Sequence, residues 1–375
     1  NTAGAQWGCS WGLEVPLVFA SGDFSETPTL KRSNAFALVA QECQAVREGV
    51  GLLDISGFSR FEVNGPGAKD WLRRLMASRL PAAGRARLAP MLAPSGRLKG
   101  DLTVFNWGDG RWWVMGSYYL RNWHMRWFHD HRTEGVDVRD ISDTVVGFGL
   151  AGPKSREVLA ALTHQDVNGD ALPFMGCTTI DVGLIRARVA RLSVCGELGY
   201  EINCEATEHI ALREMLLQAG VAQGIREFGF YAMNSLRLEK SFGIWSAEFT
   251  QDRTPGMTGM DRWIDWSRDD FIGHAAAAQA RADNSAPQRL VTLEIDADDA
   301  DASGYEPIWQ GEQRVGFVTS GGFGHYTGKS LAMGLLNNNV NETDEKLMVD
   351  VVGKRRSAST LSEPAWDPSG ARMRL

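Results

Sequence analysis

Apolar and polar residues recur at helical or strand spacing in several parts of the chain. Between Phe36 and Glu48 the apolar side chains fall roughly on one helical face, and glycines at 49 and 51 end that helix. Residues 58–63 alternate as a strand, and 68–78 continue as a helix with Pro66 near its first position. Further elements are predicted as helices over 118–131, over 207–218 with Thr207 as its cap, and over 228–242, and as a long strand over 184–194.

A strand, a Gly-Pro pair and a helix occur in this order twice. Residues 63–75 align with residues 150–162, with the two Gly-Pro pairs in register. The separation of the copies is too long for a solenoid repeat. We therefore interpret them as a duplicated supersecondary unit inside one α+β region.

Two segments differ from this pattern. Residues 1–35 carry tryptophans and prolines without a clear period, so we expect an arm that packs on the rest rather than a folding unit. After an alanine-rich, polar stretch at 275–287, short strands separated by turn residues predict a small all-β domain. Its expected strands cover 290–295, 316–319, 331–336 and 347–352. The expected domains are the arm at 1–35, an α+β region at 36–280 and the β domain at 286–375.

Composition limits the classes of protein that fit. The chain of 375 residues has a net charge of −7, and an acidic balance argues against a nucleic-acid partner. Because it has no apolar run of about 18 residues and no signal-peptide pattern, we expect no membrane association and a cytoplasmic location. The five cysteines form no C-x-x-C pair, which predicts reduced thiols and neither a disulfide framework nor a zinc site.

Common catalytic motifs are missing from the sequence. Residues 328–330 read Gly-Lys-Ser, as in a phosphate-binding loop, but Phe323 stands where that loop needs glycine, and the stretch falls among predicted strands. No G-x-S-x-G, H-E-x-x-H or helix-opening G-x-G-x-x-G occurs. His124, His129 and His131 share one predicted helix but not one face, so we expect no metal site there.

Residues 91–104 present one carboxylate, Asp101, between a glycine and a strand. Gly96 and Gly100 allow the backbone a positive φ or a close approach to a ligand. Residues 102–106 and 111–115 read as two strands around a turn. The pattern predicts a loop-to-strand junction that holds Asp101 at the rim of a hairpin, although a strand-capping or turn aspartate also fits.

Other acids also lie near glycines. With Asp101 they are Glu197, Glu201 and Glu239, and Arg237 is close in sequence to the last of them. A carboxylate that accepts hydrogen bonds from ring N–H groups suits a polar, planar, nitrogen-rich ligand. The residues themselves indicate this class of ligand and no particular member of it.

Taken in order, these residues match a known family. The chain resembles the folate-binding one-carbon transferases typified by the glycine-cleavage T-protein, and most closely the C-terminal folate half of dimethylglycine and sarcosine dehydrogenases. The matching blocks are 32–36, 45–48, 51–56, 90–101, 150–153, 196–201, 235–240, 270–273 and 367–374. The resemblance implies a multi-domain α+β fold with two interleaved subdomains and a small C-terminal β-barrel domain.

The resemblance also assigns roles to matching residues. Asp101 is expected to be the catalytic carboxylate beside the reactive nitrogens of tetrahydrofolate, because a nucleophilic amine must lose a proton as its new C–N bond forms. Glu201 is expected to accept hydrogen bonds from the pterin ring. The further candidates are Arg237, Glu197 and Tyr200 for cofactor binding and, from aromatic content near the matched blocks, Tyr118, Trp123 and Trp245 for the substrate.

Two positions depart from the family pattern. Val194 stands where a tyrosine usually precedes the pterin-binding glutamate, and loss of that ring would weaken stacking on the pterin. Met257 replaces an acid in the block 254–257. The relatives also carry a flavin half before a segment like 7–16, so this chain acts without flavin, works with a separate flavoprotein, or was trimmed from a longer chain.

The residues support three functional hypotheses. The first is a tetrahydrofolate-dependent transferase that takes a methyl or methylene unit from an N-methyl amine or related small-molecule donor. The second is a non-catalytic or partner-dependent folate-binding subunit that captures formaldehyde made by a flavin-dependent dimethylglycine- or sarcosine-type dehydrogenase. The third is a scaffold that retains the fold without the ligand, which the replacements at 194 and 257 favour.

Overall fold

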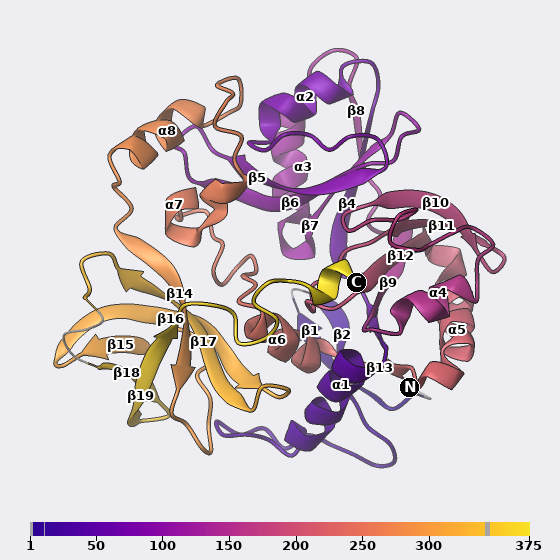
Figure 1. Ribbon diagram of the computed structural model, residues 1–375. Coiled ribbons are helices and arrows are strands. Elements are labelled where there is room, and N and C mark those ends of the chain that lie inside the picture. The colour runs from indigo at the N-terminus through magenta and orange to yellow at the C-terminus, as the bar shows by residue number, and fades with distance from the viewer. Residues whose placement is uncertain (1–2, 11, 342–345) are drawn as a thin grey trace.

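The computed structural model describes residues 3–10, 12–341 and 346–375. The described strands form a hairpin, a five-stranded sheet, a six-stranded sheet and a closed barrel. In Figure 1 the five-stranded sheet lies at the top, the six-stranded sheet on the right and the barrel at the lower left. The mixture of helices and strands and the closed C-terminal barrel confirm the predicted fold class.

The N-terminal segment contains a hairpin of β1 (Ala5–Ser10) and β2 (Leu13–Phe19), which the sequence did not predict. A register shift opposite Pro16 breaks the alternation on which such a prediction depends. The hairpin packs on the rest of the molecule, as expected of the arm, because the backbone N–H of Phe19 donates to Glu42 Oε1 (2.6 Å). The next elements are α1 (Phe36–Glu48), with its predicted bounds, and β3 (Gly51–Asp54).

The five-stranded sheet has the order β5-β6-β7-β4-β8. Two helices cover one of its faces, where Phe61, Leu102 and Val104 pack against Leu72 and Phe128. The elements are β4 (Phe58–Asn64), α2 (Ala68–Leu75), β5 (Arg85–Leu92), β6 (Leu98–Asn106), β7 (Trp112–Ser117), a 3-10 turn (Tyr118–Leu120), α3 (Arg121–Asp130) and β8 (Asp137–Asp140).

The six-stranded sheet has the order β10-β11-β12-β9-β3-β13, and within it only the pair of β13 with β3 is parallel among the described strands. Helices α4 and α5 cover one face, where Val158 and Leu212 pack on Leu150 and Ile202. The elements are β9 (Val145–Ala151), α4 (Ser155–Ala160), β10 (Cys177–Val182), β11 (Ile185–Ala190), β12 (Gly199–Glu205), a 3-10 turn (Ala206–Glu208), α5 (His209–Ala219), a second such turn (Val221–Gln223) and β13 (Arg226–Glu227).

The duplicated unit supplies one strand and one helix to each of these two sheets. One copy joins β4 to α2 and the other joins β9 to α4. Gly65 and Gly152 take φ values of 102° and 130°, and a Cβ on either would lie within 2.4 Å of a backbone oxygen, that of Gly135 or Gly49. The turn therefore requires glycine in both copies.

Several predicted boundaries were wrong. The helix predicted over 68–78 ends at Leu75, because Met76 adopts an extended conformation. The strand predicted over 184–194 covers only β11, since Leu184 lies in the tight β10–β11 turn and is 98% exposed. Thr207 does not cap α5; Glu205 and Glu208 instead form a reciprocal capping box on the preceding 3-10 turn.

A helical connection leads to the barrel. The stretch at 275–287 was expected to be a polar boundary. Helix α8, which runs from His274 to Ala282, covers most of it. Helix α6 is shorter than the predicted 228–242 and begins after Gly229. The remaining elements are α6 (Phe230–Glu239), α7 (Pro255–Thr258), a 3-10 turn (Met260–Trp263), α8 (His274–Ala282), β14 (Gln288–Ile295), β15 (Pro307–Gln310), β16 (Gln313–Gly324), β17 (Lys329–Asn337), β18 (Leu347–Val351), β19 (Lys354–Leu361) and a last 3-10 turn (Arg372–Arg374).

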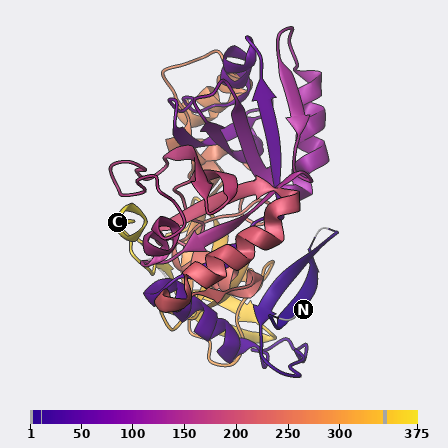
Figure 2. The same cartoon turned by 90° about the vertical axis from the view of Figure 1, so that its right-hand side faces the viewer.

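The two ends of the described chain lie on opposite sides of the molecule. Figure 2 shows the β1–β2 hairpin on one side and the C-terminal segment on the other. Among the described helices, none has both the length and the apolar composition needed to cross a bilayer.

Candidate functional site

The five-stranded and six-stranded sheets turn their uncovered faces toward each other; we call these the inner faces. On β6, Leu102 and Val104 pack under the helices, so Asp101 and Phe105 project from the inner face. Phe105 packs against Ala190 of β11, which joins the two inner faces. On β12, Tyr200 and Ile202 pack under α4 and α5, and Glu201 therefore projects toward the five-stranded sheet. Asp101 and Glu201 thus point into the space between the same two sheets.

Asp101 is the fourth residue of the nine-residue strand β6 and pairs with Pro90. The predicted position at a loop-to-strand junction was therefore wrong. The register of β5 and β6 shifts by one residue just before this pair, so that Leu92 faces Leu98 while Met91 faces Gly100. A bulge of this kind re-aims the side chains that follow it, and here it sets the direction of Asp101.

The backbone before Asp101 is fixed from the helix side of the sheet. His124 on α3 is fully buried, and its Nε2 donates to the Lys99 carbonyl at 3.0 Å. Burial lowers the pKa of His124 to about 4, so the ring is neutral at ordinary pH. A Cβ on Gly100 would lie 2.9 Å from the same Nε2, so the close approach of strand and imidazole requires glycine.

Asp101 occupies an electrostatically unfavourable place for a carboxylate. Burial raises its pKa to about 7, and its own backbone N–H is the single group that offsets this effect among the described residues. The residue still keeps some accessible surface. A carboxyl group with a pKa near 7 and some accessible surface can exchange a proton with a ligand at neutral pH.

Glu201 has a similar environment. Burial raises its pKa to about 7, and the nearby Arg60 guanidinium lowers it in part. Its Oε2 atom is buried and has no hydrogen-bond partner among the described residues. A buried acceptor without a donor is uncommon in folded proteins, and ring N–H groups of a ligand are donors of the kind that would satisfy it.

Comparison with known proteins identifies the family. The family model for the GCVT N-terminal domain matches residues 1–268, and that for the glycine cleavage T-protein C-terminal barrel domain matches residues 288–367. The chain belongs to the glycine cleavage T-protein family. This confirms the resemblance inferred from the sequence motifs.

Several known proteins resemble the chain over most of its length. Mitochondrial dimethylglycine dehydrogenase from Rattus norvegicus is 32% identical over 370 residues, which cover 97% of this chain and 43% of that protein. The chain thus spans less than half the length of these dehydrogenases. Aminomethyltransferase from Bacillus subtilis (strain 168) is 28% identical over 334 residues, covering 88% of this chain and 91% of that protein. The crystal structure of glycine cleavage system aminomethyltransferase T from Bartonella henselae shares the fold, with a TM-score of 0.83, 23% identity and coverage of 98% and 96%.

Three of the residues predicted to bind the cofactor make contacts within the fold. Arg237 is 1% exposed and donates to Asn234 Oδ1 (2.7 Å) and Glu248 Oε2 (3.3 Å) next to the barrel. Tyr200 lies on the covered face of β12, opposite to Glu201, and its hydroxyl contacts Arg156 and the Val167 carbonyl. Neither residue projects from the inner faces.

Glu197 is the third of these residues. It is fully buried between Arg47 (2.9 Å) and Arg372 (2.8 Å), and Trp366 Nε1 donates to it at 2.8 Å. Arg47 also pairs with Glu239 at 2.7 Å. The cluster joins α1 and α6 to the C-terminal segment, and both oxygens of Glu197 accept hydrogen bonds within it.

The predicted substrate contacts separate into two places. Trp123 and Trp245 lie together, with ring centroids 6.2 Å apart, near the start of β6. The Lys99 ammonium sits 3.7 Å from the centroid of the Trp123 ring, a cation–π contact. Tyr118 is engaged elsewhere, where its hydroxyl accepts a hydrogen bond from Arg121 at 2.9 Å.

Sequence reasoning missed Arg60, the cation between the inner faces. Arg60 is fully buried on β4, and its Nε donates to Asn203 Oδ1 on β12 at 2.9 Å. In a strand that alternates apolar and polar residues, the pattern predicts that an arginine at a polar position faces the solvent. The alternation is correct, but the polar face of β4 is covered by the second sheet.

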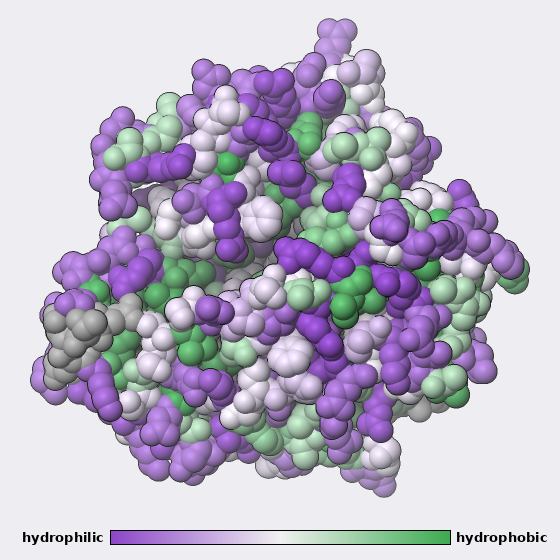
Figure 3. All heavy atoms as spheres, in the orientation of Figure 1, coloured by the Kyte–Doolittle hydropathy of each residue, from purple (hydrophilic) through white to green (hydrophobic). Residues whose placement is uncertain are grey.

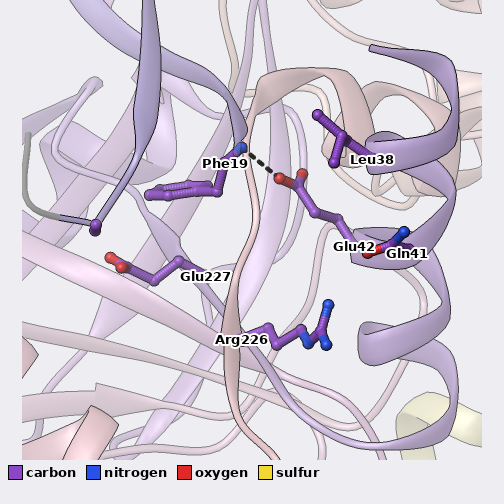
Figure 4. Close-up of a pocket in the computed structure, with 7 residues that line it drawn as sticks. Phe19, Leu38, Gln41, Glu42, Arg226 and Glu227 are labelled. Atoms are coloured by element: carbon purple, nitrogen blue, oxygen red, sulfur yellow. Dashed lines mark hydrogen bonds between the residues drawn. The ribbon is translucent and has the colours of Figure 1, made fainter. Parts of the chain in front are cut away.

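The surface is hollowed near its centre in Figure 3, where the sheets meet the barrel. Two cavities lie away from the inner faces. One of about 170 Å³ lies between the hairpin and α1, where Figure 4 shows Glu42 accepting the Phe19 N–H. The other, of about 220 Å³, is lined by Arg32, Phe36 and His325 among others. Within the described residues, no group of three or more His, Cys, Asp or Glu side chains could hold a metal ion.

Proposed function

We propose that this chain transfers to tetrahydrofolate a methyl unit from an N-methyl amine, or a methylene unit from a related donor that is already at the formaldehyde oxidation level, with Asp101 as the proton acceptor. The supporting observation is that Asp101 projects from an inner face with a pKa raised to about 7 by burial. Membership of a family that includes aminomethyltransferases supports the reaction class.

The residues on the inner faces fit a reduced folate. Tetrahydrofolate, when bound, supplies the amine nitrogens that accept the one-carbon unit. Glu201, whose buried Oε2 lacks a donor among the described residues, would accept hydrogen bonds from pterin N–H groups and so orient the ring. As the new C–N bond to the folate nitrogen forms, the C–N bond of the donor would break and its amine would leave. Asp101 would take the proton that the attacking nitrogen loses, which balances the proton that the leaving amine gains, and it would stabilise the positive charge that precedes this loss.

The oxidation level of the transferred carbon separates the first two hypotheses. Methyl transfer leaves that level unchanged, so the isolated chain suffices. Capture of a methylene unit requires an oxidised donor, which a flavoprotein partner would make. The match to mitochondrial dimethylglycine dehydrogenase supports partner-dependent capture as our second candidate function.

Turnover by the isolated chain tests the proposal. Tetrahydrofolate is incubated with N-methyl amines or with formaldehyde, and the loaded folate is quantified by chromatography. We expect Asp101→Asn to reduce transfer far more than folate binding, whereas Asp181→Asn, an exposed strand aspartate, should leave both unchanged. Equal loss of binding and transfer in Asp101→Asn would assign Asp101 to binding.

A binding titration separates the remaining hypotheses. Folate binding without turnover until a flavoprotein is added supports the partner-dependent subunit. Absence of binding heat on titration with reduced folate supports the scaffold hypothesis. Val194 packs in the core with Cys195 and Phe228, and Met257 is 5% exposed, so neither presents a ring or an acid to a ligand.

A further inference from the structure

Arg60 has an unusual environment for a buried cation. Its side chain is fully buried on the inner face of β4. Within the described residues, its hydrogen bonds all go to neutral acceptors, namely Asn203 Oδ1 (2.9 Å), the Phe58 carbonyl (3.0 Å) and the Ile55 carbonyl (2.9 Å). The guanidinium is therefore held in place without a carboxylate in direct contact. A buried charge of this kind is costly unless another charge in reach compensates it.

Two acids and a thiol lie near Arg60. The acids are Asp54 at the end of β3 and Glu201 on the inner face of β12, and the thiol is Cys204 on the covered face of β12. Burial raises the pKa of Cys204 to about 12, so the thiol stays neutral. Asp54 already accepts from the Ser56 N–H (2.8 Å) and lies 3.2 Å from His209 Nε2. Among the described residues, no group donates a hydrogen bond to the buried Oε2 of Glu201.

The geometry links Arg60 to Glu201 through one strand. Asn203, which Arg60 contacts, stands two residues after Glu201 on the same face of β12. Arg60 therefore places its positive charge at Asn203, which is the side chain next to Glu201 on the inner face of β12. Because Arg60 is fully buried, its charge interacts more strongly with a neighbouring charge than it would at the surface.

We propose that Arg60 is a positioning residue of the folate site, whose buried charge favours the carboxylate form of Glu201 that accepts hydrogen bonds from a pterin ring. This inference rests on the proposed folate function. It assigns to Arg60 no contact with the ligand; the residue acts through Glu201.

The pH dependence of folate binding tests the role of Arg60. The probe is 5-formyltetrahydrofolate, a stable folate with the pterin amino and N3–H donors, titrated into the full chain between about pH 5.5 and 8.5. Because removal of the cation raises the pKa of Glu201, the pH below which the folate affinity falls should be higher in Arg60→Met than in wild type by about one pH unit. At about pH 7 the affinity should fall about fivefold.

Two further variants separate this role from a structural one. Arg60→Lys keeps the charge and loses the fork of hydrogen bonds, so it should retain the wild-type pH profile even where it lowers the melting temperature. In a Glu201→Gln background, Arg60→Met should cause no further shift of the profile. A shift of equal size in that background, or a profile in Arg60→Lys that moves as far as in Arg60→Met, would overturn the inference. Arg60→Gln replaces Arg60→Met if the latter does not fold.

A measurement without ligand distinguishes failure of this inference from failure of the folate function. The change in unfolding free energy caused by Glu201→Gln, followed against pH, reports the ionisation of Glu201 directly. In the Arg60→Met background the midpoint of this change should move to higher pH. If wild type binds no folate but this midpoint moves, the folate function fails and the electrostatic link stands. If the midpoint stays fixed, the link itself is refuted.

Discussion

Replacing Asp101 by asparagine should stabilise the fold while it abolishes transfer. The two side chains have nearly the same shape, so the change removes the charge and little else. A turn or capping aspartate gains stability from its charge-assisted hydrogen bonds, and its replacement lowers stability. An aspartate held on the inner face for chemistry is destabilising when ionised, so its replacement raises stability.

The magnitude follows from the pKa of Asp101. Burial raises it from 3.8 to about 7, and each pH unit in this interval corresponds to about 1.4 kcal/mol, so the cost at about pH 8 is at most about 4 kcal/mol. Because the side chain keeps some accessible surface and its neighbours can relax, we expect about 1–3 kcal/mol. The folded state binds the proton of Asp101 more tightly than the unfolded state does. The contribution of Asp101 to the free energy of unfolding is therefore most favourable at acid pH, and it is lost as pH rises from about 4 to 7.

Thermal unfolding of wild type and Asp101→Asn at a series of pH values measures this effect. At about pH 8 the variant should melt several degrees higher, the gap should narrow through pH 6, and it should vanish near about pH 4. Asp181→Asn, which changes an exposed aspartate paired with Arg186 at the surface, should show a small difference without this pH dependence. A variant that melts below wild type at about pH 8 would refute the reasoning and favour a structural aspartate.

The structure supports three further predictions. In steady-state assays, kcat/KM should fall steeply below about pH 7 because Asp101 and Glu201 must both be ionised. On the acid side of a plot of log kcat/KM against pH, Glu201→Gln should reduce the slope from about two to about one. An unchanged slope would contradict the idea that both acids must lose a proton. Gly100→Ala should cost about 1–3 kcal/mol in urea unfolding because its Cβ meets His124 Nε2 at 2.9 Å, and His124→Ala in the same chain should recover part of the loss. Arg47→Met should cost about 3–5 kcal/mol because it leaves Glu197 and Glu239 with less compensation in the interior, and a loss under about 1 kcal/mol would show that the cluster is not a stabilising one.

Much of the secondary structure could be predicted because its signals are local. The bounds of α1 and the two strand-turn-helix units depend on periodicity and on glycine turns that neighbouring residues determine. The β1–β2 hairpin was missed because a register shift opposite Pro16 interrupts its alternation. Gly100 and the bulge before Asp101 gave the appearance of a loop, but they lie within the paired strands β5 and β6, and only Gly96 lies in the turn between them.

The candidate site was harder to predict because it depends on which face a side chain occupies. Tyr200 and Glu201 are adjacent in the same motif, yet a strand sends them to opposite faces, so a motif match cannot distinguish a ligand contact from a core residue. Arg60 and Asn203 are far apart in sequence and meet only because two sheets pack face to face. Contacts of this kind follow from the topology and leave no local pattern.

A raised pKa alone does not identify functional acids in this protein. Burial raises the pKa of Glu42, Asp101 and Glu201 to about 7 alike. Glu42 accepts the backbone N–H groups of Phe19 and Gly229, and so it ties the hairpin and the start of α6 to α1. Within the described fold, Asp101 and Glu201 do not link two elements in this way, and the Oε2 of Glu201 has no hydrogen-bond donor. Among the described residues, the burial of Glu201 is offset in part by Arg60 and that of Asp101 in part by its own backbone N–H, and this incomplete compensation is the physical reason why we propose that both acids meet a ligand.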